Sequence, residues 1–215
     1  MQDAENSGGG ASLFLPVECE PDWLDADLAD ALLEYAIARE DAFRPGSVVY
    51  GGEDHINPAL RNVLKLADLG PYVRPLKQRA RAAKPVLEQR LGVAGFTPTS
   101  FEIEIAAHGD GARFVRHIDT FTVANRGTSP RILTLILYLN RRPKGYSGGA
   151  LCMHSIAGHG VREIVPEHNL LVAFPAIAPH SVEQVQSTSG AFADRRFAVN
   201  IWVHGSMDTA SGNPA

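Results

Sequence analysis

A histidine and an aspartate stand two residues apart in the segment RHIDT, at His117 and Asp119. The residues before them alternate as in a β-strand, where residues i and i+2 project from the same face. An imidazole and a carboxylate side by side can occupy two neighbouring positions around a metal ion. A salt-bridged surface pair is the alternative that these two residues alone leave open.

A second histidine would complete a set of two histidines and one carboxylate, the facial triad of non-haem Fe(II) oxygenases. This set leaves coordination positions open for substrate and oxygen. We favour His180 as the third ligand, because it follows the apolar run LLVAFPAIAP and precedes the alternating run SVEQVQ. His154, at the end of another predicted strand, could also lie near such a site.

The segment RFAVNIWV, residues 196–203, places Arg196 on the same strand face as Asn200 and Trp202. If this face points inward, the Arg196 guanidinium must be paired, and its planar fork suits a carboxylate ligand. A salt bridge to an Asp or Glu of the protein is the alternative. Arg195 falls on the opposite face and is the poorer candidate.

The segment RILTLILYLN, residues 131–140, divides in the same way. One face is entirely leucine, and the other carries the hydroxyls of Thr134 and Tyr138. A carboxylate held by Arg196 could accept hydrogen bonds from both hydroxyls. A core tyrosine bonded to the backbone is the alternative for Tyr138.

The elements that must position these residues follow from the periodicity of the chain. Helices are expected from Asp22, with Leu24, Leu28, Leu32 and Tyr35 on one face, from Asn57-Pro58 to Gly70, and from about Arg74 to Leu91. From Phe101 onward the pattern changes to short runs of period two, separated by turn signals. We therefore predict a mainly β fold, a sandwich or jelly roll buttressed by N-terminal helices.

The length of 215 residues favours one domain. We expect a disordered N-terminus over residues 1–12 and a single domain over 13–204, with a helical buttress at about 22–92 and a jelly-roll core at about 101–204. A disordered tail is expected over 205–215.

The net charge of −4 argues against nucleic acid as the main partner, because duplex binding needs a basic surface. The chain has no apolar run as long as a membrane span and no recognisable signal peptide, so we expect no membrane association and a cytoplasmic protein.

Six segments, in this order, resemble the 2-oxoglutarate- and Fe(II)-dependent dioxygenases, in particular the bacterial type of the prolyl 4-hydroxylase-like branch. They are HGDGARFVRHIDT, RILTLILYLN, YSGGAL, VPEHNLLVAFP, HSVEQV and FADRRFAVNIW, which lie between about Phe101 and Trp202. The resemblance implies a double-stranded β-helix with helices packed on its outer sheet. It also implies that His117, Asp119 and His180 hold iron.

The resemblance further implies that Arg196 pairs with the distal carboxylate of 2-oxoglutarate, with Tyr138 as a helper. Relatives carry a polar residue near the other end of this cosubstrate, which makes His108 a further candidate contact. One departure from the animal prolyl hydroxylases is the longer segment between His180 and Arg196.

The implied activity is hydroxylation of an unactivated C–H bond with release of succinate and CO2. Fe(II), 2-oxoglutarate and O2 would be required, with ascorbate as an optional further cofactor. The substrate would be a protein residue, a peptide or an amino-acid-like small molecule, selected by loops 120–130 and 155–168, the former as a lid. A catalytically idle metal- or ligand-binding module and a cupin-like metal enzyme without 2-oxoglutarate are the alternatives. The sequence leaves the oligomeric state open.

Overall fold

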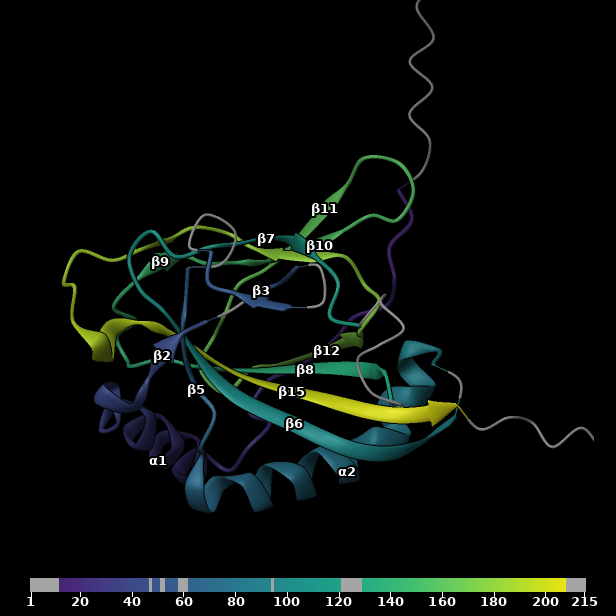
Figure 1. Cartoon of the computed structure of the whole chain (residues 1–215), viewed down its shortest axis with the longest axis horizontal. Coiled ribbons are helices and arrows are strands. Elements are labelled where there is room, and N and C mark those ends of the chain that lie inside the picture. Colours follow the sequence, from purple (N-terminus) through teal and green to yellow (C-terminus); the bar gives the residue numbers. More distant parts are fainter. Residues whose placement is uncertain are drawn as a thin grey trace, which may run out of the picture.

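The computed structural model of the chain describes residues 12–46, 48–50, 53–57, 62–93, 95–120 and 129–207. Two antiparallel β-sheets face each other, and two helices cover the outer face of the larger sheet (Figure 1). The strands are β1 (Glu18–Glu20), β2 (Arg44–Pro45), β3 (Val48–Tyr50), β4 (Glu53–His55), β5 (Leu64–Leu66), β6 (Phe96–His108), β7 (Phe114–His117), β8 (Arg131–Leu139), β9 (Ser147–Gly148), β10 (Leu151–His154), β11 (Val161–Ile164), β12 (Leu171–Pro175), β13 (His180–Val182), β14 (Val185–Gln186) and β15 (Arg196–Met207). The α-helices are α1 (Ala26–Ile37) and α2 (Val73–Leu91), and the short 3-10 helices are η1 (Glu40–Ala42), η2 (Gly70–Tyr72) and η3 (Phe192–Asp194).

The helices form where the sequence places apolar residues at helical spacing. Their buried residues are Ala29, Leu32, Leu33 and Ala36 in α1, and Leu76, Ala80, Leu87 and Leu91 in α2. Helix α1 begins after Asp25 rather than at Asp22, because Asp22 has a left-handed φ of 51°. Helix α2 ends at Leu91 and is capped by Gly92, whose φ of 61° suits a residue without a Cβ.

The helix predicted from Asn57 to Gly70 is wrong for the part of this segment that the structure describes. Residues Leu64–Leu66 form β5, which pairs with β6 opposite Ile105–Ala107. The hydrogen bonds offered by the neighbouring strand decide the local conformation here, in place of the Asn-Pro start signal. Residues 58–61 lie outside the described part of the chain.

The larger sheet has the strand order β1-β12-β8-β15-β6-β5-β2. The side chains on its helix-facing side form the main core. This core includes the leucine face of β8, Leu133, Leu135, Leu137 and Leu139, together with Phe197, Val199 and Ile201 of β15. Because successive side chains of a strand point to opposite faces, the other residues of β8 and β15 point into the space between the two sheets.

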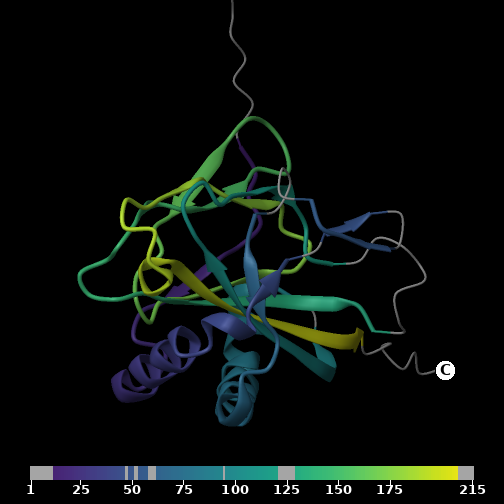
Figure 2. The ribbon, with the colours of Figure 1, turned by 60° about the vertical axis from the view of Figure 1, so that its left-hand side comes forward.

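The smaller sheet has the order β11-β10-β13-β7 and lies over the other face of the larger sheet (Figure 2). A second apolar cluster fills the space between them, with contributions from β8, β10, β12 and β15. Its buried members are Ile136, Tyr138, Leu151, Met153, Val172, Phe174, Ala178 and Ala198. The predicted mainly β fold with N-terminal helices is confirmed, and the two facing sheets form the double-stranded β-helix.

Strand β15 continues to Met207 and pairs with the start of β6. The disordered tail predicted from Gly205 therefore does not hold for residues 205–207, and 208–215 lie outside the described residues. At the other end, Ser12 donates a hydrogen bond to the carbonyl of His159, and residues 1–11 are not described. Among the described residues, no helix combines the length and apolar character that a bilayer crossing requires.

Candidate active site

The two histidines of the predicted metal site meet across one pair of strands. Strand β13 pairs with β7 so that His180 lies directly opposite His117, although the two residues are far apart in the chain. Their ring centroids are 4.2 Å apart. The sandwich thus brings together the two imidazoles that the sequence analysis selected.

Each imidazole is oriented by the backbone two residues before it. The Nδ1 of His117 lies 2.8 Å from the carbonyl oxygen of Val115, and the Nδ1 of His180 lies 2.9 Å from that of Ala178. A carbonyl can only accept, so Nδ1 carries a proton in both rings, and in the neutral form of each ring Nε2 presents its lone pair. This is the tautomer that a metal ligand needs.

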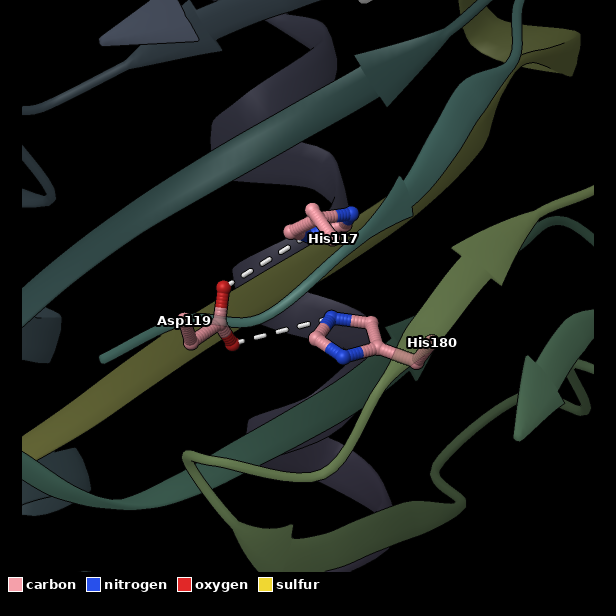
Figure 3. Close-up of side chains that lie close together, drawn as sticks. All are labelled: His117, Asp119 and His180. Atoms are coloured by element: carbon pink, nitrogen blue, oxygen red, sulfur yellow. Dashed lines mark ion pairs between the residues drawn. The ribbon is translucent and has the colours of Figure 1, made fainter. Parts of the chain in front are cut away.

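Asp119 lies just beyond the end of β7, where its backbone N–H donates to the carbonyl of Ala176. Its Oδ1 is 3.6 Å from His117 Nε2, and its Oδ2 is 3.7 Å from His180 Nε2 (Figure 3). One ligand atom from each of the three residues can be chosen so that all lie within 4.8 Å of one another. The arrangement could hold one metal ion.

The protonation states also suit a cation. Burial opposes ionisation of Asp119, but its interactions with His180, His117 and the Trp202 indole together hold the pKa of this carboxyl well below its usual range. Burial lowers the pKa of His180 to about 4, despite the attraction of Asp119. At neutral pH the site therefore presents an anionic carboxylate and a neutral His180 ring.

Two aromatic rings frame the histidine pair. Phe114 stacks on His117 with ring centroids 3.6 Å apart, and Phe174 lies 4.7 Å from His180. The sequence analysis did not single out either residue. Phe114 stands three positions before His117 in β7, and the strand pattern did not signal this contact.

Thr134 also lies at this site. Its hydroxyl donates to Asp119 Oδ2 at 2.7 Å, and the side chain is buried. The sequence analysis placed Thr134 among the 2-oxoglutarate contacts, but a hydroxyl has one proton, and here Asp119 accepts it.

A second polar group lies deeper between the sheets, at the start of β15. Arg196 is 1% exposed, and its guanidinium lies 4.8 Å from the centroid of the Tyr138 ring. Its Nε donates to the carbonyl of Gly149 at 2.7 Å, and its Nη1 lies 3.2 Å from Nδ1 of the buried His108. The three residues predicted to contact the cosubstrate, Arg196, Tyr138 and His108, are thus gathered in one place.

This cluster has unused hydrogen-bonding capacity. Within the described residues, the contacts of the Arg196 guanidinium are the Gly149 carbonyl, His108 and the Tyr138 ring rather than a carboxylate, and the buried Tyr138 hydroxyl beside it makes no hydrogen bond of normal geometry. Burial raises the pKa of Tyr138 to about 12, although the charge of Arg196 opposes this, so the phenol remains a donor. A buried cation beside a free donor fits the carboxylate of a small ligand.

The two weaker candidates lie elsewhere. Arg195 packs over the Phe192 ring, 5.0 Å from its centroid, and lines a separate cavity of about 250 Å³. His154 bonds through Nε2 to Ser181 Oγ at 2.8 Å and does not join the metal-site cluster. Of the predicted lid, residues 121–128 lie outside the described part of the chain.

The chain is similar in sequence to known oxygenases and hydroxylases. Residues 103–204 match the family model of the 2OG-Fe(II) oxygenase superfamily. An uncharacterized PKHD-type hydroxylase of Synechocystis sp. is 28% identical over 141 residues, which is 62% of this chain and 46% of that protein. The chain thus spans about half the length of the curated relative that it matches.

Solved structures share the fold. The prolyl hydroxylase of Trichoplax adhaerens, in complex with a peptide of a hypoxia-inducible factor, superposes with a TM-score of 0.67 at 18% identity, over 93% of this chain and 88% of that one. A Pseudomonas putida prolyl-4-hydroxylase gives a TM-score of 0.62 at 22% identity, over 88% and 92%. A viral collagen prolyl hydroxylase of Paramecium bursaria Chlorella virus-1, as a 2-oxoglutarate complex, gives 0.59 at 14% identity, over 88% and 96%.

The superfamily is named for Fe(II) and 2-oxoglutarate, so the predicted cofactor and cosubstrate are confirmed at the level of the family. The predicted relationship to the prolyl 4-hydroxylase-like enzymes is confirmed as well. Residues 103–204, just under half of the chain, thus match the 2OG-Fe(II) oxygenase superfamily, and the chain shares its double-stranded β-helix fold with prolyl 4-hydroxylase structures.

Proposed function

We propose that this protein is an Fe(II)- and 2-oxoglutarate-dependent hydroxylase in which His117, Asp119 and His180 bind the iron. The observation that supports the proposal is that one ligand atom from each of these residues lies within 4.8 Å of the other two, while both histidines bond a backbone carbonyl through Nδ1. Two neutral imidazoles and one carboxylate form the donor set of non-haem Fe(II) oxygenases. Three protein ligands leave coordination positions for cosubstrate and oxygen.

We further propose that Arg196 and Tyr138 bind the distal carboxylate of 2-oxoglutarate. Tyr138 follows Thr134 by four residues on the same face of β8. A linear dicarboxylate lying along this face would bind the metal through one end and the guanidinium through the other. Phe174 connects the metal site with Tyr138, since its ring contacts that of His180 and it belongs to the same apolar cluster as Tyr138.

His108 has a supporting role in this proposal. Its Nδ1 contacts the Nη1 of Arg196, and the two residues are direct partners in the β6–β15 register. The imidazole therefore holds the fork of Arg196 in a fixed orientation, and it lies close enough to contact the cosubstrate.

When bound, Fe(II) and 2-oxoglutarate would activate O2, which supplies the oxidising power: one oxygen atom would hydroxylate an unactivated C–H bond, and the other would enter succinate as 2-oxoglutarate loses CO2. The chain's own residues bind and orient these groups and exclude water around them, because His180 and Arg196 are buried and Phe114 and Phe174 cover the imidazoles. The substrate that we propose is a protein residue, a peptide or an amino-acid-like small molecule. The peptide bound to the Trichoplax enzyme supports the peptide class.

The proposal is tested by succinate release from 2-oxoglutarate in the presence of Fe(II), first without substrate and then with a peptide pool or a cell extract. Products are identified by a mass gain of one oxygen atom. We expect slow uncoupled turnover by the wild-type protein and none by Asp119→Ala.

Two outcomes would favour the alternatives instead. A protein that binds Fe(II) but never consumes 2-oxoglutarate would be an idle binding module. Metal-dependent activity that survives both the omission of 2-oxoglutarate and the change Arg196→Ala would identify a cupin-like enzyme.

A further inference from the structure

Hydrogen bonds hold both the backbone and the carboxylate of Asp119. Its backbone N–H donates to the carbonyl of Ala176, and its own carbonyl accepts from Arg131 Nη1 at 3.3 Å. These two bonds fix the backbone and leave the carboxylate free to rotate about its side-chain torsions. The bond from Thr134 acts on the carboxylate itself and, at 2.7 Å, is shorter than the distances from the carboxylate oxygens to the two histidine rings.

The two carboxylate oxygens therefore differ. Oδ2 accepts the Thr134 hydroxyl at 2.7 Å and lies on the His180 side, whereas Oδ1 lies on the His117 side. A short bond from a hydroxyl to an ionised carboxylate is among the stronger hydrogen bonds of proteins, and here both partners are buried. An iron ion that engaged Oδ2 would compete with this bond, so Oδ1 is the more available ligand atom.

We propose that Thr134 is a positioning residue that holds Oδ2 of Asp119 and leaves Oδ1 to bind the metal alone. The inference rests on the proposed function, since it takes Asp119 to be a metal ligand. Binding through both oxygens would occupy one more coordination position. Thr134 thereby preserves the open positions that cosubstrate and oxygen need.

The surrounding structure keeps the threonine in place. Thr134 lies in the centre of the larger sheet, paired with Phe174 on one side and with Trp202 on the other. The Arg131 guanidinium covers the Trp202 ring at 4.0 Å. Because β8 is hydrogen-bonded to a strand on each side, a substitution that keeps the β-branched shape should leave the backbone unchanged.

The test compares Thr134→Val with Thr134→Ser. Valine keeps the shape and removes the proton donor, whereas serine keeps the donor. Metal-free protein is titrated with Mn(II), and the free ion is followed by electron paramagnetic resonance. We expect the dissociation constant of Thr134→Val to rise about 10- to 100-fold, as is typical when a metal ligand loses its outer hydrogen bond, and that of Thr134→Ser to stay near wild type.

A second measurement reports on coordination rather than on stability. The visible absorption of the Co(II)-loaded protein depends on the number of ligand atoms, so it should change in Thr134→Val and be restored in Thr134→Ser. Ile136→Val is the matched control, because Ile136 follows on the same face of β8 and belongs to the apolar cluster. Its Mn(II) affinity and Co(II) spectrum should equal those of the wild type.

Wild-type affinity and an unchanged Co(II) spectrum in Thr134→Val would overturn the inference. Should the valine variant not fold, Thr134→Ala removes the same donor and gives the same test. Failure of the proposed function looks different: the wild-type protein itself would then bind Mn(II) no better than Asp119→Ala.

Discussion

The neighbouring arginines at the start of β15 permit a sharp test of the cosubstrate site. Arg196 points between the sheets and is 1% exposed, whereas Arg195 is half-buried and packs on Phe192. Replacing Arg196 by methionine keeps most of the side-chain volume and removes the charge and the hydrogen-bond fork. The same change at Arg195 removes an equal charge one residue away, which makes it the matched control.

The size of the effect follows from the burial of the guanidinium. Two of its five N–H donors are used by Gly149 and His108 in the described structure, so enough remain for both oxygens of a carboxylate. Removing one partner of a buried, hydrogen-bonded charge pair costs about 2–5 kcal/mol. We take about 3 kcal/mol, because Tyr138 and the metal would still bind the ligand, and this corresponds to about a hundredfold weaker binding.

The assay is calorimetric titration of 2-oxoglutarate into the protein loaded with Mn(II) in place of Fe(II), so that binding is measured without turnover. We expect the large loss in Arg196→Met, an intermediate loss in Arg196→Lys and almost none in Arg195→Met. Thermal unfolding of each variant separates a loss of binding from a loss of structure. Equal affinities of Arg196→Met and the wild type, or a comparable loss in Arg195→Met, would refute the assignment.

Three further predictions concern the supporting structure. In Gly149→Ala the new Cβ would lie 2.7 Å from Arg196 Cδ at a φ of 67°, so 2-oxoglutarate binding measured by calorimetry should weaken, and wild-type affinity would contradict the tight approach. Phe197 has no exposed surface, so Phe197→Ala should lower the free energy of unfolding in urea by about 3–5 kcal/mol. A loss below about 1 kcal/mol would show that the core around Phe197 is not closely packed. The pKa of His180 is near 6.5 in the unfolded chain and about 4 in the folded, metal-free protein. Between these values the unfolded state binds more protons, so the free energy of unfolding should fall as the pH drops through this window. The lowered pKa of Asp119 has the same sign at still lower pH, and an unfolding midpoint that does not change between pH 7 and pH 5 would contradict this reasoning.

The candidate site could be predicted from sequence where it depends on the direction of side chains along one strand. The alternation in β15 separates Arg196 from Arg195, and the alternation in β8 separates the hydroxyl face from the leucine face. The stripes of α1 and α2 are visible for the same reason, since each element carries its own period.

Other features required contacts that no local pattern encodes. The segment at Leu64–Leu66 has a helix signal but becomes a strand, because it pairs with β6. The hydroxyl of Thr134 was correctly placed on the inner face, yet whether it meets 2-oxoglutarate or Asp119 depends on where the chain runs after β7.

The sequence by itself determined which residues face the interior and which donor types are present there, because period two is a property of each strand alone. The tertiary structure decided which of these residues meet. The register of β13 against β7 sets His180 opposite His117, and the turn after β7 sets Asp119 between the two rings. Register results from hydrogen bonding and packing between segments distant in the chain, and shifting it by one residue would turn one imidazole to the opposite face of the sheet.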